Sequence, residues 1–170
     1  MFYIGIDPSL SSTGIVVLDK NSRLMSSTLI QSNLKGTERL IELRNLLREC
    51  IRRVDSPRVL IERYSFGSRA GQAFSIGEWG GVLRVLLVES GHEVVEVSPS
   101  TLKKFITGKG NVKKDMILKE VFKKWDEDFN DDNLADAYGL ARMNWSIDRK
   151  EDLLKYEKDC IKVIMDNKNE

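Results

Sequence analysis

The sequence has few of the residues that carry soft-metal or disulfide chemistry. Its 170 residues include one histidine and two cysteines, Cys50 and Cys160, which lie far apart in the chain. This scarcity argues against a metal site built from thiolates and imidazoles. We interpret the two cysteines as reduced thiols of a cytoplasmic protein, with a disulfide between them as the alternative.

Long apolar runs and a basic leader are also missing. The longest apolar stretches, residues 14–18 and 85–88, are far too short to cross a bilayer. The chain opens on an apolar strand pattern with no basic stretch before it, which is unlike a signal peptide. With 41% hydrophobic and 31% charged residues, the sequence predicts one soluble globular domain with no membrane attachment.

The chain has almost no net charge, but its charges are unevenly distributed. The formal net charge is +1. Eight lysines lie between residues 99 and 124, where only two acidic residues oppose them. Such a basic segment indicates a polyanionic partner, although the lysines could instead form the solvated face of a helix. The eight are Lys103, Lys104, Lys109, Lys113, Lys114, Lys119, Lys123 and Lys124.

The order of the apolar patterns predicts a mixed α/β fold. We expect strands at residues 1–7, 13–19, 23–31, 58–62 and 93–97, and helices at residues 36–54, 69–90, 99–106, 113–125, 132–146 and 148–167. Short connections predict that the first three strands form an antiparallel meander, whereas helical crossovers lead to the last two. The result is a five-stranded sheet with helices on both faces. We place the domain at residues 1–147, with a charged helical extension of it at 148–170.

Four carboxylates stand in segments that can aim them at one point. Asp7 and Glu62 end two apolar strands that the crossovers should place side by side. Asp132 and Asp136 are four residues apart on one helix and therefore face the same side. Acids at the ends of buried strands are costly unless a cation neutralises them. Because softer ligands are scarce, we expect that cation to be Mg²⁺ or Mn²⁺.

These acids predict metal-assisted chemistry on phosphate. Two metal ions can activate a water and stabilise the leaving oxygen of a phosphodiester. Each acid also has a simpler interpretation. Asp132 could cap its helix, although Asp131 suits that role better, and Asn133 could offer a neutral oxygen to a metal. Glu62 and Asp136 could be surface acids.

The turn after Asp7 has a second interpretation. Residues 5–14, GIDPSLSSTG, resemble the phosphate-binding hairpin of actin-like and sugar-kinase ATPases. Those ATPases need two such domains around a cleft, and this chain has room for one. We therefore expect no nucleotide cofactor.

Two further segments are candidates for nucleic-acid contact. A glycine turn at residues 108–110 lies between lysine pairs and would let the backbone approach phosphates closely. Tyr64 and Phe66 follow Glu62 in a loop that ends at Arg69, where exposed aromatics could stack on unpaired bases. Phe66 could instead be a core residue beneath the loop. The basic candidates are Lys103, Lys104, Lys109, Lys113, Lys114 and Arg69.

The predicted helix at residues 69–90 contains four glycines. Each interior glycine costs about 1 kcal/mol of helix stability, so a compensating contact is expected. We interpret the glycines as sites of close approach by another helix or by a ligand backbone, at a dimer interface or a DNA interface.

Taken together, these motifs resemble the RuvC-type Holliday-junction resolvases of the RNase H-like superfamily, and most closely the variant carried by bacteriophages. The resemblance covers residues 2–143. It depends on the order and spacing of several short motifs. These are GIDPS with Thr13 and Gly14, the Ile61–Glu62 pair with its aromatic loop, GEWGG at 77–81, Pro99, Lys103, the turn at 108–110, Lys114, and DNLADA at 132–137.

The resemblance implies a homodimeric, Mg²⁺-dependent endonuclease that acts on branched DNA. It would resolve a four-way junction by paired symmetric nicks that leave 5′-phosphate and 3′-hydroxyl ends. A related nuclease acting on other branched DNA or on RNA, and a branched-DNA-binding protein without catalysis, are the alternatives.

The resemblance also implies roles for individual residues. Asp7, Glu62, Asp132 and Asp136 match the acidic metal-binding tetrad, Lys103 and Lys114 match phosphate-binding lysines, and Tyr64 or Phe66 matches the junction-opening aromatic. One spacing differs, because the last two acids of the cellular family are usually three residues apart. Here the residue three before Asp136 is Asn133.

Overall fold

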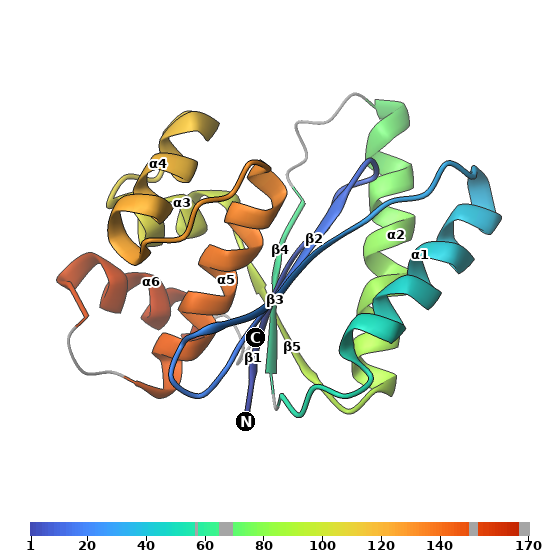
Figure 1. Ribbon diagram of the computed structural model, residues 1–170. Coiled ribbons are helices and arrows are strands. Elements are labelled where there is room, and N and C mark those ends of the chain that lie inside the picture. The colour runs from blue at the N-terminus through green and yellow to red at the C-terminus, as the bar shows by residue number, and fades with distance from the viewer. Residues whose placement is uncertain (57, 65–69, 150–152, 167–170) are drawn as a thin grey trace.

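A five-stranded mixed sheet runs through the middle of the molecule (Figure 1). The computed structural model describes residues 1–56, 58–64, 70–149 and 153–166, without the side chains of residues 70–73 and 114. The strands are β1 (Tyr3–Asp7), β2 (Thr13–Leu18), β3 (Leu24–Ile30), β4 (Arg58–Glu62) and β5 (Glu93–Val97). The helices are α1 (Gly36–Ile51), α2 (Ala70–Glu89), α3 (Pro99–Thr107), α4 (Lys114–Trp125), α5 (Asp132–Asp148) and α6 (Lys155–Asp166).

The strand order confirms the predicted topology. The sheet has the order β3-β2-β1-β4-β5. The β1–β2 and β2–β3 pairs are antiparallel, as short hairpin connections require. The β1–β4 and β4–β5 pairs are parallel. Helix α1 connects β3 to β4, and α2 connects β4 to β5. Strands β1 and β4 are therefore central neighbours that end at the same edge of the sheet.

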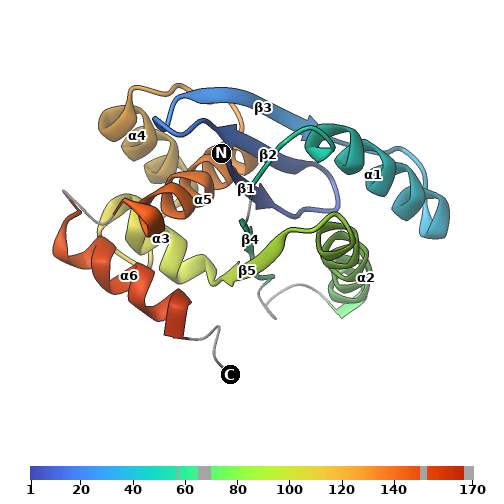
Figure 2. The same ribbon diagram turned by 90° about the horizontal axis from the view of Figure 1, so that it is seen from below.

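Helices cover both faces of the sheet and form two separate cores (Figure 2). Successive side chains of a strand point to opposite faces, and β1 follows this rule. Ile4 and Ile6 face α1 and α2, whereas Tyr3 lies in the core beneath α5. The α5 side also carries α3, α4 and α6 (Figure 1). Asp7 and Glu62 lie where β1 and β4 end, at one edge of the sheet.

Two predicted helix boundaries are wrong. The first helix ends at Ile51 rather than at residue 54, because Ile51 completes the buried stripe begun by Leu43 and Leu47. The last helix begins at Lys155 rather than at residue 148. Residues 147 and 148 instead belong to α5, whose final turn is held by a contact between Asp148 and Arg58 on β4.

The two cysteines are free thiols, so the alternative of a disulfide between them is wrong. Cys160 is buried in the core beneath α5, and Cys50 is half-buried on α1. In the part of the chain that the structure describes, none of the helices has the length and apolar character needed to span a membrane.

Candidate active site

Strand register places Asp7 and Glu62 next to each other on the α5 side of the sheet. Ile6 pairs with Ile61 in the parallel β1–β4 ladder. The next residues, Asp7 and Glu62, therefore lie side by side at the same edge of the sheet. Asp7 shares a face with Tyr3, and Glu62 shares a face with Leu60, which lies in the same core as Tyr3. The strand-end acids thus meet as the sequence predicts.

Helix α5 brings the other two acids to that edge. Asp131 caps the helix, because its side chain accepts hydrogen bonds from the backbone amides of Asn133 and Leu134 at 2.9 and 3.3 Å. Asp132 is therefore not the capping residue. Asp136 lies one turn further along and is half-buried.

Two strand glycines allow α5 to lie directly on the sheet. A Cβ added at Gly5 would stand 2.1 Å from the carbonyl oxygen of Ala137, and one added at Gly14 would stand 2.3 Å from that of Asn133. Both partners are backbone atoms, so any larger residue would push the helix away. Gly14 is also the partner of Asp7 in the β1–β2 ladder. The close approach therefore sets the N-terminal turns of α5 beside Asp7.

The four acids line a single pocket of about 230 Å³. Its wall is formed by Asp7, Ser9, Glu62, Lys103, Ile117, Asp132, Asn133 and Asp136. As the side chains stand, the described residues contain no preassembled group of three or more acid, histidine or cysteine side chains arranged to hold an ion. The donor chemistry nevertheless fits a hard divalent cation, because the polar wall offers chiefly carboxylate and amide oxygens.

The loop that follows Asp7 is fixed by a buried contact with α2. The indole Nε1 of Trp79 donates to Thr13 Oγ1 at 3.0 Å, and the Thr13 hydroxyl donates to the carbonyl oxygen of Ser9 at 3.0 Å. The amide of Ser9 donates back to Thr13 Oγ1 at 3.3 Å. Both Trp79 and Thr13 are fully buried. Trp79, part of the GEWGG motif, thus fixes the backbone of the pocket residue Ser9 through Thr13.

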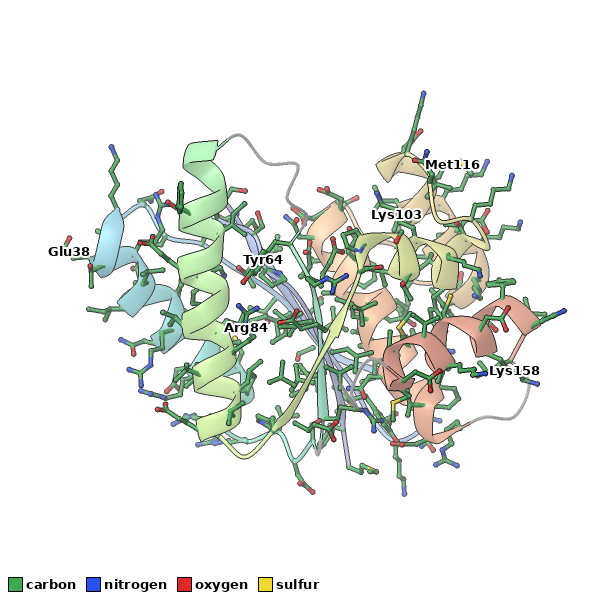
Figure 3. All side chains as sticks on the ribbon, turned by 180° about the vertical axis from the view of Figure 1, so that it is seen from behind. Glu38, Tyr64, Arg84, Lys103, Met116 and Lys158 are labelled. Carbon is green, nitrogen blue, oxygen red and sulfur yellow. The ribbon has the colours of Figure 1, made fainter. Side chains whose placement is uncertain are left out.

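The candidate lysines are distributed around the α3–α4 hairpin. Lys103 lies on α3 and contributes to the pocket wall (Figure 3). Lys104 is half-buried, whereas Lys109 and Lys113 in the connecting turn are exposed. Lys114 begins α4, and its side chain lies outside the described residues.

Tyr64 packs against α2. The guanidinium of Arg84 lies 5.3 Å from the centre of the Tyr64 ring and donates a hydrogen bond to its hydroxyl (Figure 3). The Tyr64 ring fills the space next to Gly80, where an added Cβ would stand 2.5 Å from it. The close approach predicted at this helix glycine is thus made by an aromatic side chain rather than by a helix or ligand. Phe66 and Arg69 lie outside the described residues.

Sequence reasoning missed the role of Gly5 and Gly14 in seating α5. A usable signal was present, because glycine within a strand often marks a close approach of another backbone. It also missed Arg58 and Asn144, which join α5 to β4. An arginine that opens an apolar strand and an asparagine within an apolar helix are both unusual enough to suggest a buried polar contact.

Comparison with known proteins identifies the family. A family model described as crossover junction endodeoxyribonuclease RuvC matches residues 3–143. RuvC of Brachyspira hyodysenteriae is 30% identical over 154 residues, which covers 88% of this chain and 96% of that protein. Both findings confirm the resemblance inferred from the motifs.

Solved structures confirm the fold. The structure of Thermus thermophilus RuvC matches with a TM-score of 0.75 at 22% identity, covering 88% of this chain and 97% of that chain. RuvC of the same organism in complex with a Holliday junction substrate matches with a TM-score of 0.73 at 23% identity, covering 83% and 90%. The chain therefore belongs to the RuvC family of crossover junction endodeoxyribonucleases.

Proposed function

We propose that this protein is a metal-dependent endonuclease that resolves four-way DNA junctions. The observation that carries the proposal is the convergence of Asp7, Glu62, Asp132 and Asp136 on one pocket in a chain of the RuvC family. The RuvC of T. thermophilus was solved with a Holliday junction substrate, which supports the choice of DNA. The products would be paired symmetric nicks with 5′-phosphate and 3′-hydroxyl ends, made in the cytoplasm.

RuvC-family nucleases depend on metal ions, and we assign the four acids as ligands of two Mg²⁺ ions, with Mn²⁺ as a substitute. When bound, such ions activate a water and stabilise the leaving oxygen of the phosphodiester. Asp7 and Glu62 end central strands and supply a rigid side of the pocket. Asp132 and Asp136 supply the opposite side from α5, with Asn133 as a neutral oxygen donor at its edge.

The basic residues are proposed to hold the DNA. Lys103 lines the pocket, where its ammonium group can offset charge on the scissile phosphate. Lys114 is assigned the same role at the start of α4. Lys104, Lys109, Lys113 and Arg69 would contact flanking phosphates. For the aromatic that opens the junction, Phe66 is the better candidate, because Tyr64 is already packed against Arg84.

We also propose that the protein works as a homodimer through the outer face of α2. Phe74, Val85 and Val88 are 79%, 57% and 63% exposed on this helix. Gly77 and Gly81 lie four residues apart, and an added Cβ at either would meet open space, so a second helix could approach closely. Light scattering should give twice the chain mass for the wild type and the chain mass for Val88→Glu. An unchanged mass in the variant would place the interface elsewhere.

The central experiment is cleavage of a labelled four-way junction in the presence of Mg²⁺. The wild type should give symmetric nicks, and Asp7→Asn should give none while keeping the same thermal unfolding profile. Asp159→Asn, which changes an exposed acid on α6, is the matched control and should cut normally. Equal cutting by wild type and Asp7→Asn would overturn the assigned site.

A substrate panel separates the neighbouring functions. Preference for flaps, forks or RNA over the four-way junction would make the protein a related nuclease with another substrate. Junction binding without cleavage over a range of divalent ions would make it a DNA-binding protein. Symmetric nicking of the four-way junction alone supports resolution.

A further inference from the structure

A buried polar network joins α5 to the sheet at the end remote from the acid pocket. The Nε of Arg58 donates to the side-chain oxygen of Asn144 at 2.8 Å. Its Nη2 donates to the backbone oxygen of Asn144 at 3.2 Å and to Asp148 Oδ1 at 3.1 Å. Arg58 is 9% exposed and Asn144 is fully buried. Both side chains lie within the core, so their hydrogen bonds to each other replace hydrogen bonds to water.

The amide of Asn144 completes the network by contacting two strands at once. Its Nδ2 donates to the carbonyl oxygen of Ile4 on β1 at 3.0 Å and to that of Arg58 on β4 at 2.9 Å. These are the two strands whose far ends carry Asp7 and Glu62. One side chain of α5 is thus bonded to both strands that supply the other half of the pocket.

The other side chains of α5 that are buried are chiefly apolar. Apolar burial is non-directional, so it holds the helix against the sheet without defining its position along the strands. Gly5 and Gly14 define how near the helix lies, because they admit its backbone. Hydrogen bonds have directional geometry, and those of Asn144 define where along β1 and β4 the helix lies.

The helix transmits that position to the pocket. Asn144 and Asp136 belong to the same uninterrupted helix, eight residues apart, which corresponds to about 12 Å along its axis. A shift or rotation of α5 at Asn144 would therefore move Asp132 and Asp136 relative to the strand-end acids. Metal ligation requires such acids to be held in place by the residues behind them.

We propose that Arg58 and Asn144 are positioning residues of the active site. They fix α5 along β1 and β4 so that the acids of the helix meet those of the strands around divalent ions. The inference rests on the proposed function, since it concerns ion binding by the same four acids. A contact that lies outside the pocket thus determines how well the pocket binds divalent ions.

The test must separate positioning from stability. In the double variant Arg58→Met/Asn144→Leu, apolar groups of similar size replace the buried cation and the buried amide together, so neither side chain is left buried without the other. The carbonyl oxygens of Ile4 and Arg58 lose the bonds from Asn144 in the same variant. The Asp148 side chain is one-third exposed and can be solvated in that variant. The matched control is Lys124→Met/Glu157→Met, which removes another buried charge pair but joins α4 to α6.

The measurement is the rise in melting temperature as Mg²⁺ or Mn²⁺ is added, without DNA. We expect Arg58→Met/Asn144→Leu to bind the ion about 10-fold more weakly than the wild type, the size of effect seen when residues behind metal ligands are changed. The control pair should keep the wild-type affinity for the ion, whatever its melting temperature without metal. Junction binding in EDTA should be the same for the wild type and Arg58→Met/Asn144→Leu.

The outcomes are distinguishable. Wild-type ion affinity in Arg58→Met/Asn144→Leu would overturn the inference, even if that variant were less stable. If the double variant does not fold, Arg58→Lys, which keeps the charge but not the forked geometry, should bind the ion several-fold more weakly; unchanged affinity there would also overturn it. An ion-induced shift that survives Asp7→Asn in full would instead count against the proposed function.

Discussion

Lys124 is a lysine of the basic segment that serves the fold. Its ammonium group lies 4.7 Å from the centre of the Trp125 ring, donates to the carbonyl oxygen of Phe105 at 3.1 Å, and forms an ion pair with Glu157 on α6. The Glu157 side chain is 6% exposed. For this lysine, neither a DNA contact nor a solvated helix face describes the structure. The pair fastens α6 to α4, and the bond to Phe105 joins α4 to α3.

Removing one partner of this pair should cost more than removing both. Lys124→Met leaves the Glu157 carboxylate buried without its cation and should lower the free energy of unfolding by about 3–5 kcal/mol. Lys124→Met/Glu157→Met should recover most of that loss, because no charge remains in the site. Urea denaturation at pH 7 measures both values. A double variant as unstable as the single one would show that the packing of the side chains, not the buried charge, is what matters.

Tyr138 predicts how stability depends on alkaline pH. Burial raises the pKa of Tyr138 from its ordinary value of 10.0 to about 12, with Arg142 acting in the opposite direction. The folded protein therefore retains a proton that the unfolded chain releases between those values. The resulting stabilisation is complete below pH 10 and is lost as the pH rises towards 12, by about 3 kcal/mol in total.

Tyr138→Phe should lose less stability between pH 10 and 12 than the wild type. Denaturant midpoints across this range give the comparison. Burial and the nearby Asp148 also raise the pKa of Tyr3, so a smaller slope of the same sign should persist in the variant. Parallel pH profiles for the two proteins would contradict the assignment of the buried phenol as a source of the alkaline decline.

At the scale of elements, the seating of α5 on the sheet determines whether the acids meet. Gly14→Ala places a methyl group against the backbone of Asn133, and that backbone can give way only if the helix moves. We expect a loss of about 1–3 kcal/mol of stability, typical of overpacking, together with a weaker Mg²⁺-induced rise in melting temperature. Thermal scans with and without Mg²⁺ measure both effects.

Gly77→Ala is the matched glycine control, made in the monomeric Val88→Glu background because Gly77 lies on the proposed dimer face. An added methyl group meets open space within the chain, and α2 should gain about 1 kcal/mol of helix stability. Its Mg²⁺-induced shift should equal that of Val88→Glu alone. If Gly14→Ala retained a full Mg²⁺-induced shift, close seating of the helix would be unnecessary for the site.

The sheet and the strand-end acids could be predicted because their signals are local. Apolar runs and short connections define the strands, and a strand-end position defines the place of Asp7 and Glu62. The boundary between α5 and α6 could not be predicted in this way. It depends on the contact of Asp148 with Arg58, which is 90 residues distant in sequence. No pattern within α5 indicates that partner.

The surroundings of Tyr64 show the same limit. An aromatic residue in a loop after an acidic strand end is typical of a base-stacking contact, and this interpretation depends on the ring being exposed. The ring is instead held by Arg84 and accommodated by Gly80. The glycine alone indicates a close approach, but only the folded arrangement of α2 against the sheet identifies which group makes it.

On the scale of the whole molecule, the uneven charge distribution matters more than the net charge of +1. Lys103 on α3 stands in the pocket wall, whereas Lys158 is exposed on α6 (Figure 3). If Lys103 neutralises a phosphate, its contact releases condensed counterions, and junction affinity falls with added salt. A lysine that makes no phosphate contact adds nothing to that dependence.

Lys103→Ala should therefore weaken junction binding most at low salt, and the difference from the wild type should narrow as salt rises. The slope of log affinity against log salt concentration should decrease in magnitude by about 0.9, the value for one phosphate contact. Lys158→Ala should leave the slope unchanged. Binding titrations in Ca²⁺ or EDTA over a range of KCl concentrations give the slopes. A uniform loss of affinity at every salt concentration would mean that Lys103 supports the pocket by packing. Only a phosphate contact releases counterions and so changes the slope.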